Sequence, residues 1–349
     1  MKFIRIGKNK IGDKYKPYII VEACVNHQGN FNLAKKMIYF SRKVGAQCIK
    51  FQHHIVDEEM LVKNIPKSSN FTKPLSQVIE ETNFTLKEHI QLKKICEKIG
   101  IEYLCTPFSI KAAKELHSIN VKAFKTGSGE LTNHPFISYI AKLGKPMVVS
   151  TGMSNPDEIH ETVKIIKKQN TPLALTHCVS AYPCPYEIMN LNFITELSKK
   201  YNIPIGLSDH TPTIYNALGA VSLGACIVEK HFTFNKKLPG PDHKSSIDPS
   251  ELKMLIDGTS ANFLARGSKK IIHNQEKEII SWARESVVST DFIKKGEKLS
   301  KKNTSTKRPS PKKGEIEAKN YQNIIGKKAK KNIPNNQIIK FKNIKKKKF

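Results

Sequence analysis

Four side chains that could bind an anion or a metal ion stand at the ends of short apolar runs. Lys50 and Lys125 lie in "AQCIKFQ" and "VKAFKTG", and His210 and His231 follow "IPIGLSD" and close "ACIVEKH". Two fixed ammonium groups suit a substrate with phosphate and carboxylate groups, because they offset its charge. Two imidazoles on neighbouring strands could share a divalent metal ion and leave positions open for substrate. Lysines that extend to solvent and hydrogen-bonded core histidines are the plainer alternatives.

Nearly every apolar run of this kind ends in a polar or ionisable residue. In a parallel barrel the carboxyl ends of all strands point to one face, where active sites are built. One polar end is ordinary, but eight in one chain are not expected from loop composition alone. The eight ends supply Glu22; Lys50 and Gln52; Thr106; Lys125, Ser128 and Glu130; Ser150 and Thr151; His177; Ser208, Asp209 and His210; and Glu229, Lys230 and His231.

The stretch "KTGSGE", residues 125–130, joins a cation, a hydroxyl and two glycines at one of these ends. Its backbone N–H groups could hold an anion in the manner of a phosphate-binding nest. An ordinary Gly-Ser-Gly turn is the simpler interpretation of this stretch alone. The loop 232–250 is too rich in glycine and proline to be helical, and its length favours a role in covering a site.

The runs that would position these residues alternate with amphipathic segments. Leu33, Met37, Phe40 and Val44 share one face after the first run, and Pro156 opens a helix after the fifth. Near-continuous apolar strands alternating with helices predict a parallel sheet covered by helices. Eight such units predict a (β/α)8 barrel over residues 1–267, with an open doubly wound sheet as the alternative. The predicted strands are 18–24, 46–52, 101–107, 121–127, 146–152, 172–178, 203–209 and 225–231.

The pattern changes after residue 267. Residues 268–285 read as a polar linker, and 286–349 as a small domain rich in short strands and Gly, Pro and Asn turns. Residues 286–349 carry twenty Lys and Arg against four Asp and Glu, a net +16 out of +29 for the whole chain.

The strong positive charge raises nucleic acid as a partner. Only five of the 59 basic residues are arginine, whereas direct base recognition favours arginine, so we expect no nucleic acid partner. No apolar run approaches 18 residues and no signal-peptide pattern opens the chain, so we expect a cytoplasmic protein without membrane attachment. The seven scattered cysteines lack a C-x-x-C pair and fit a reducing compartment, most of them as small core residues.

Longer motifs resemble a known family. "EACVNHQGNFNLAKKM", "IKFQHHIVDEEM", "KTGSGELTNHPFI", "HCVSAYPCPYE", "GLSDHT", "EKHFT" and "PGPDHKSSIDP" resemble, in this order, the sialic acid (N-acetylneuraminate) synthase family. "STDFIKKGEKLS", "STKRPS" and "NIIGKKAKKNI" resemble its C-terminal antifreeze-like (SAF) domain. The resemblance implies a TIM barrel followed by a small β-rich SAF domain, and it runs almost end to end.

The activity implied by the resemblance is a condensation of phosphoenolpyruvate with the open-chain aldehyde of an N-acetylated mannosamine-type sugar. The products would be a nine-carbon 2-keto sugar acid and phosphate, released by C–O cleavage. The family pattern places phosphoenolpyruvate on Lys50, Thr106, Lys125, Ser128, Ser180 and Ser208, with Asn70 as a further candidate. It places Mn²⁺ or Mg²⁺ on His210 and His231, and it makes Glu22 a catalytic residue that orients the sugar or water. It places the sugar near Gln52, Glu130, Tyr182, Glu229, Asp242 and Arg308.

Arg308 is the only arginine of residues 286–349. The resemblance implies that the SAF domain of a partner subunit brings it over the N-acetyl group of the sugar, in a domain-swapped homodimer. A surface arginine without a role is the alternative.

The identity of the sugar stays open. N-acetylmannosamine comes first, which would make the product N-acetylneuraminate. Ser180 and "GPDHK" are typical of members that use 2,4-diacetamido-2,4,6-trideoxymannose, the legionaminate precursor, and the pseudaminate precursor is third. A Schiff-base aldolase using Lys125 or Lys230 and a polyanion-binding protein are the competing functions.

Overall fold

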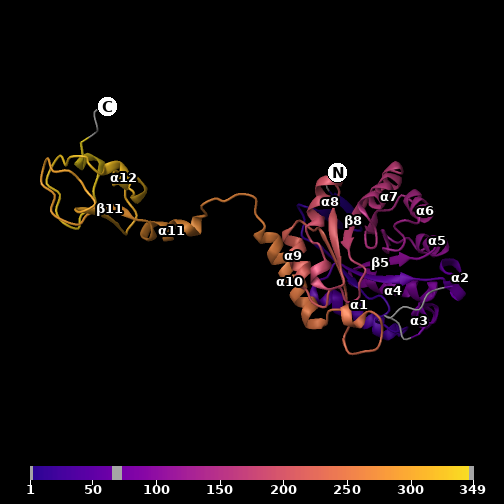
Figure 1. Ribbon diagram of the computed structural model, residues 1–349. Coiled ribbons are helices and arrows are strands. Elements are labelled where there is room, and N and C mark those ends of the chain that lie inside the picture. Colours follow the sequence, from indigo (N-terminus) through magenta and orange to yellow (C-terminus); the bar gives the residue numbers. More distant parts are fainter. Residues whose placement is uncertain (1–2, 65–72, 346–349) are drawn as a thin grey trace. The chain divides into compact units, whose positions relative to one another are not determined.

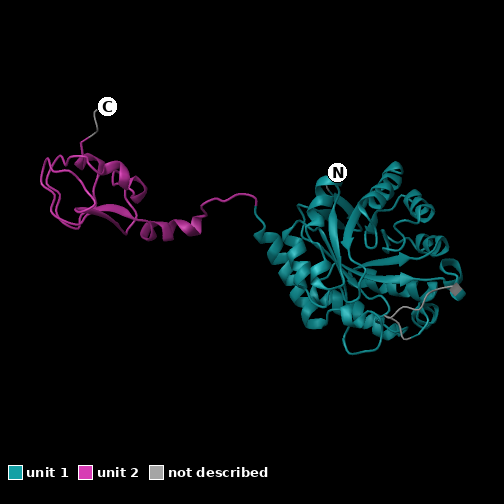
Figure 2. Ribbon diagram, viewed as in Figure 1, with its two compact units in different colours: residues 1–267 teal, residues 268–349 magenta. Residues whose placement is uncertain are grey.

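A computed structural model describes residues 3–64 and 73–345. The chain forms two compact units, residues 1–267 and 268–349 (Figure 2). In the first unit eight parallel strands follow the order β5-β4-β3-β10-β9-β8-β7-β6, and β5 and β6 lie side by side to complete a near-closed ring. Helices surround this ring (Figure 1). The predicted (β/α)8 barrel is confirmed, and the open doubly wound sheet is wrong.

Each of the eight predicted apolar runs contains one barrel strand. All residues of β3, β7, β8, β9 and β10 are buried, because helices cover the strands outside and side chains fill the ring inside. Burial on both faces explains why these strands read as continuous apolar runs. The strands are β3 (Tyr18–Glu22), β4 (Cys48–His53), β5 (Glu102–Pro107), β6 (Phe124–Thr126), β7 (Met147–Ser150), β8 (Leu173–Cys178), β9 (Ile205–Asp209) and β10 (Ile227–His231).

One helix of the outer layer follows each strand. None of the helices that the structure describes is long and apolar enough to cross a membrane. The main helices are α1 (Phe31–Val44), α4 (Leu86–Ile99), α5 (Ile110–Ser118), α6 (His134–Lys142), α7 (Pro156–Lys168), α8 (Phe193–Tyr201), α9 (Tyr215–Ser222) and α10 (Pro249–Ala265).

Local sequence explains where these helices begin. Pro156 opens α7 as predicted, and Asn155 caps it by accepting hydrogen bonds from the next backbone N–H groups. The predicted face of α1 is only partly right. Met37 is buried, but the centre of the buried face runs through Ala34 and Ser41, while Phe40 is half-buried.

A hairpin that the sequence analysis did not anticipate precedes the barrel. It consists of β1 (Phe3–Ile6) and β2 (Asn9–Gly12). Ile4, Ile6 and Ile11 are buried in one cluster with the inward side chains at the amino ends of the strands, such as Leu104. The hairpin therefore closes the amino end of the ring and leaves the carboxyl end for a site.

Three connections carry extra elements at the carboxyl ends of the strands. The β10–α10 loop is not α-helical, as predicted, and it pairs back onto the barrel through a bridge between Phe232 and Ile247. The extra elements are α2 (Val56–Glu59), η1 (Val62–Asn64) and α3 (Leu75–Thr82) after β4, η2 (Tyr186–Ile188) after β8, and η3 (His243–Ser245) after β10.

The second unit has a core of its own, built from small apolar residues such as Val287, Ile293 and Ile333. Its backbone forms a two-stranded antiparallel sheet and several isolated bridges, which fits the predicted strand-rich domain. The second half of the predicted polar linker is helical. The elements are α11 (Asn274–Ala283), β11 (Ser286–Ser289), β12 (Thr304–Lys307), η4 (Ala318–Asn320), α12 (Tyr321–Ile324) and η5 (Phe341–Asn343).

Candidate active site

The carboxyl ends of the strands surround one cavity of about 560 Å³. Because side chains alternate along a strand, every second residue at an end points into the ring. Most predicted site residues take the inward positions, and loops supply the others. The predicted residues that line this cavity are Glu22, Lys50, Gln52, Thr106, Lys125, Ser128, Glu130, Ser180, Tyr182, Ser208, His210, Glu229, His231 and Asp242.

Two buried lysines and two buried glutamates form the floor of the cavity. The Lys50 ammonium pairs with Glu22 and lies 3.8 Å from Glu229 Oε1. The Lys125 ammonium lies 3.5 Å from the same Glu229 oxygen, so this carboxylate sits between the two cations. All four side chains are almost fully shielded from solvent.

The four charged groups shift the pKa of one another. Burial alone would lower the pKa of Lys50, but the carboxylates of Glu22 and Glu229 outweigh it and raise that pKa. Burial raises the pKa of Glu22, although Lys50 opposes the shift. Burial likewise favours a higher pKa for Glu229, but the two ammonium groups lower it. Burial lowers the pKa of Lys125, although Glu229 opposes the shift. While both ammonium groups are charged the floor can receive an added anion, and Glu22 is the carboxyl that most readily takes up a proton.

Hydroxyl groups complete the surroundings of the two cations. Thr106 Oγ1 accepts a hydrogen bond from Lys50 at 3.0 Å, and Ser150 Oγ accepts one from Lys125 at 2.6 Å. The Ser208 hydroxyl donates to Glu229 at 3.1 Å. A Cβ on Gly152 would collide with the Ser128 and Ser180 hydroxyls, so only glycine lets these two hydroxyls approach the backbone at this position so closely. Cations and hydroxyls in this arrangement can bind a phosphate or carboxylate group.

The predicted metal ligands, His210 and His231, lie next to each other in the cavity. The ring centroids of His210 and His231 are 5.3 Å apart, and the Tyr182 ring packs against His210 at a tilt, with centroids 4.1 Å apart. His231 Nδ1 is buried without a hydrogen-bond partner and lies 4.0 Å from Asp242 Oδ2. Burial and the neighbouring His210 lower the pKa of His231 well below its usual value, so this ring stays neutral, the form that binds metals. The donor set therefore fits a divalent cation.

Sequence comparison assigns both parts of the chain to known families. A sequence model of the NeuB family matches residues 37–271, more than half of the chain, and one of the SAF domain matches residues 284–345. The chain belongs to the NeuB family. The resemblance inferred from the motifs is confirmed, as is the SAF domain.

Relatives across the NeuB family cover nearly the whole chain. It is 39% identical to an uncharacterized protein of Methanocaldococcus jannaschii, over 97% of this chain and 98% of that protein. It is 38% identical to the N,N'-diacetyllegionaminic acid synthase of Campylobacter jejuni, over 93% of this chain and 99% of that protein. The N-acetylneuraminic acid (sialic acid) synthetase structure from Leptospira borgpetersenii aligns with a TM-score of 0.74 and 35% identity, over 80% of this chain and 95% of that chain. The chain is therefore an enzyme of the nonulosonate synthase class.

Some of the polar side chains at strand ends point away from the active-site cavity. Lys230 is buried on the outer side of β10, where its ammonium lies 3.0 Å from Asp209 Oδ2. This pairing removes Lys230 as the nucleophile of a Schiff-base aldolase and leaves Lys125 as the only lysine of the two inside the cavity. In the motif "GLSDHT", Ser208 and His210 therefore face the site and Asp209 does not.

Two further predicted residues, Asn70 and Arg308, are not among the described residues that line the cavity. Asn70 lies outside the described residues. Arg308 belongs to the second unit, where its side chain is exposed and its Cζ lies 5.5 Å from the ring centroid of Trp282 on α11. Its predicted approach to the sugar stays a prediction.

The sequence analysis missed several residues of the cavity wall. Cys24 and Cys178 were expected to be core residues, and they are buried but line the cavity. Strand ends gave no sign of the apolar wall, because the β4–α4 connection supplies most of it. Its members are Met60, Leu75, Val78, Ile79 and Phe108.

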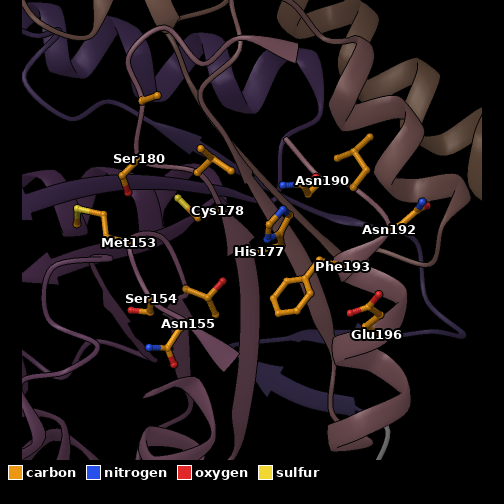
Figure 3. A pocket seen from close by; sticks show the side chains of 14 residues that line it. Met153, Ser154, Asn155, His177, Cys178, Ser180, Asn190, Asn192, Phe193 and Glu196 are labelled. Carbon is orange, nitrogen blue, oxygen red and sulfur yellow. The ribbon is translucent and has the colours of Figure 1, made fainter. Parts of the chain in front are cut away.

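A second cavity of about 900 Å³ lies beside the first (Figure 3). Met153, Cys178 and Ser180 line both, but among the described residues that line the second cavity none is a lysine or arginine. His177, a predicted strand-end residue, points into this second cavity and lies 2.6 Å from the Met189 carbonyl oxygen. The smaller cavity, with its paired charges, is the better candidate for chemistry on an anion.

The buried carboxyl of Glu130 should make the stability of the protein depend on pH. Its Oε2 is buried without a hydrogen-bond partner, and burial raises the pKa of Glu130 to about 7. The folded protein therefore holds this proton more tightly than the unfolded chain, whose glutamates titrate near 4.5. Below pH 4.5 the Glu130 carboxyl is protonated in both states and does not affect the free energy of unfolding. As the pH rises from there to about 7, the carboxyl lowers the free energy of unfolding more and more. We expect Glu130→Gln to raise the free energy of unfolding at pH 8 by about 3 kcal/mol and not at pH 4.5.

Urea unfolding of both proteins across this pH range checks the expectation. Glu161→Gln on the exposed face of α7 removes the same charge and controls for the change in net charge. A stability difference between Glu130→Gln and wild type that does not change with pH would contradict the assignment.

Proposed function

We propose that this enzyme condenses phosphoenolpyruvate with the open-chain aldehyde of an N-acetylated amino sugar and releases phosphate. The observation that carries the proposal is the meeting, in one cavity, of two buried lysines with the pair His210 and His231. Lys50 and Lys125 would offset the negative charge of phosphoenolpyruvate, with Thr106, Ser128 and Ser208 as hydroxyl partners. Ser180 lines the same cavity, and Asn70 stays a candidate for binding phosphoenolpyruvate.

A divalent cation, Mn²⁺ or Mg²⁺ by the family pattern, would be held by His210 and His231 and would polarise the aldehyde oxygen when bound. Asp242 and Tyr182 border this position and would orient the sugar. Gln52 and Glu130 also line the cavity, where they can bind sugar hydroxyl or amide groups.

The bonds change in a fixed order in this proposal. C3 of phosphoenolpyruvate attacks the aldehyde carbon, whose oxygen takes up a proton, and water adds at C2 and gives up a proton. The C2–O bond to phosphate then breaks as the new C2 hydroxyl gives up its proton to the departing phosphate, which leaves the keto group and inorganic phosphate. The Glu22 carboxyl, with its raised pKa, is suited to accept the proton of the water. Lys50 and Lys125 would stabilise the charge of the departing phosphate throughout.

The lining of the cavity supports a deoxygenated acceptor. Met60, Leu75, Val78, Ile79 and Phe108 present an apolar wall. A 2,4-diacetamido-2,4,6-trideoxy sugar carries a methyl group at C6 and an acetamido group at C4, where N-acetylmannosamine carries a hydroxymethyl group and a hydroxyl group. Burying a hydroxyl against such a wall leaves it without a partner. We therefore place the legionaminate precursor ahead of N-acetylmannosamine, the acceptor favoured by the sequence, and the C. jejuni relative supports this order.

N-acetylmannosamine remains the second candidate acceptor. The structural relative from L. borgpetersenii, an N-acetylneuraminic acid synthetase, favours it. The pseudaminate precursor keeps the third place that the sequence motifs give it. It differs from the legionaminate precursor only in stereochemistry, so the apolar wall does not distinguish these two sugars.

Phosphate release tests both levels of the proposal. With phosphoenolpyruvate, metal and each of the three sugars in turn, we expect the largest kcat/KM with the legionaminate precursor and no release after chelation. Preference for N-acetylmannosamine would reverse the acceptor assignment and leave the reaction standing. Phosphate release that chelators do not affect, or borohydride trapping of a pyruvate adduct on Lys125, would contradict the reaction itself.

The assembly is also a proposal. We place the enzyme in the cytoplasm as a homodimer in which the SAF domain of each subunit serves the barrel of its partner. Arg308 would then reach the acetamido group of the sugar.

A further inference from the structure

Cys24 occupies a constrained position just beyond the end of β3. Its backbone N–H donates to Glu22 Oε1 at 2.7 Å, which fixes the turn. Its φ of 40° lies in the left-handed region, where a side chain is disfavoured and glycine is not. Backbone strain of this kind persists where the surroundings impose it, and it gathers at functional sites. The thiol of Cys24 lines the active-site cavity and is not part of the apolar core.

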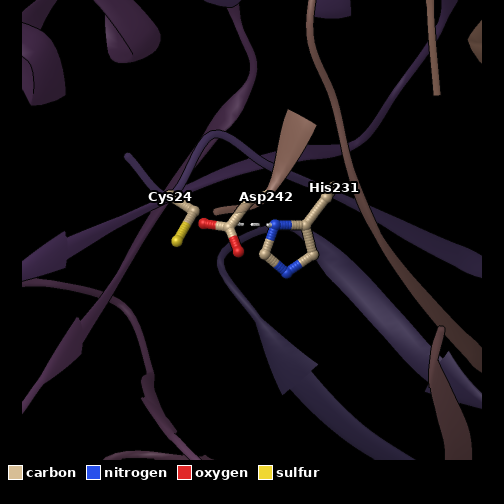
Figure 4. A group of neighbouring side chains, drawn as sticks. All are labelled: Cys24, His231 and Asp242. Carbon is tan, nitrogen blue, oxygen red and sulfur yellow. Dashed lines mark ion pairs between the residues drawn. The ribbon is translucent and has the colours of Figure 1, made fainter. Parts of the chain in front are cut away.

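Two further donors meet the sulfur of Cys24. Ligand atoms of Cys24, His231 and Asp242 all lie within 4.8 Å of one another, and all three side chains are buried (Figure 4). They come from three segments, because β3 pairs with β10 so that Glu22 lies opposite His231, while the β10–α10 loop brings in Asp242. The buried His231 Nδ1 has no hydrogen-bond partner. A sulfur, a nitrogen and a carboxylate oxygen around one point form a tripod of ligands.

We propose that Cys24 binds, as a thiolate, the divalent cation that His231 holds, and that the site therefore favours a thiophilic ion such as Zn²⁺, Co²⁺ or Fe²⁺ over Mg²⁺. The proposal rests on the proposed function in that His231 serves the same cation. Imidazole and carboxylate alone suit Mn²⁺ or Mg²⁺, whereas a thiolate is a poor ligand for Mg²⁺ and a strong one for softer ions. The S–H bond breaks as the sulfur–metal bond forms, and the proton leaves to solvent.

Cobalt spectroscopy of the metal-free full-length protein tests the proposal, because a Co²⁺–thiolate bond gives a charge-transfer band in the near ultraviolet. We expect this band on titration of wild type with Co²⁺. In Cys24→Ser it should vanish, and the Co²⁺ affinity should fall roughly tenfold or more while the Mg²⁺ affinity stays unchanged. Cys24→Gly provides a second variant, since glycine suits this φ and keeps the fold if serine does not. Thermal unfolding of both metal-free variants verifies that they are folded.

Cys178→Ser is the matched control, because Cys178 is the other thiol found in the cavity and lies 3.8 Å from His210 Nδ1. The band should persist in this variant, and its loss there with retention in Cys24→Ser would overturn the proposal. Wild-type protein that binds Co²⁺ with visible d–d bands but no charge-transfer band would also overturn it and leave the proposed reaction intact. Wild-type protein that binds no Co²⁺ would contradict the metal site of the proposed function as well.

Discussion

Replacing Lys50 by methionine is expected to lower kcat/KM for phosphoenolpyruvate by about a thousandfold, which corresponds to about 4 kcal/mol of transition-state stabilisation. The Lys50 ammonium is buried, pairs with Glu22, and donates to Thr106 at 3.0 Å, so water cannot replace it when the anion arrives. Methionine fills the same volume without charge. The carboxyl of Glu22, whose pKa is already raised by burial, can become protonated in the variant and need not remain as an unpaired charge.

Steady-state kinetics and calorimetry of phosphoenolpyruvate binding check this result, with thermal unfolding to verify the fold. Lys111→Met, on the exposed surface of α5, is the matched control and should keep wild-type activity. If Lys50→Met stays within tenfold of wild type, the anion does not bind at the cavity floor.

Glu229 explains why both lysines matter together. One of its oxygens lies 3.5 Å from Lys125 and 3.8 Å from Lys50, so this carboxylate keeps the two ammonium groups charged and close before substrate binds. The floor is nearly neutral as a result, which lowers the cost of burying it. An arriving trianionic substrate can then compete for cations that are already in place, and no charged side chain has to move into the site.

The barrel and its rim could be predicted from the sequence for a physical reason. Strands buried on both faces leave continuous apolar runs, and the polar residue that ends each run marks the open face of the ring. The hairpin of β1 and β2 escaped prediction because each strand has only four residues amid basic ones. The alternation of Ile4 and Ile6 before Gly7 was the only signal.

Which strand ends face inward could not be settled from the sequence alone. Lys230 and Lys125 look alike in the chain, but one pairs with Asp209 outside the ring and the other with Glu229 inside it. The left-handed conformation of Cys24 could not be read from the sequence either, because no glycine marks this position in the turn after β3. The apolar wall comes from a connection between elements, where no periodicity marks the residues that turn toward the cavity.

The second large effect is expected when Arg308 is replaced, and it concerns binding of the acceptor sugar. Its side chain is exposed in the second unit and stacked over the exposed Trp282, so in that unit its guanidinium is open to a ligand. A charged hydrogen bond to the acetamido oxygen, in a site closed to water, contributes about 3 kcal/mol. We therefore expect Arg308→Ala to raise KM for the sugar about a hundredfold and to leave KM for phosphoenolpyruvate nearly unchanged. Equal increases of the two KM values would contradict the proposed role of Arg308 in binding the sugar.

Whether Arg308 serves its own barrel or that of a partner is decided by pairing it with the Lys50 variant. Two differently tagged chains, Lys50→Met and Arg308→Ala, are co-expressed, and mixed dimers are purified through both tags. In a swapped dimer, one site of each mixed dimer joins an intact barrel to an intact SAF domain and the other site carries both substitutions. Mixed dimers should therefore recover about half of the wild-type activity at low sugar concentration, although neither parent is active there. If each Arg308 serves its own subunit, every site keeps one defect, and mixed dimers that stay as inactive as their parents would place the guanidinium over the barrel of its own chain.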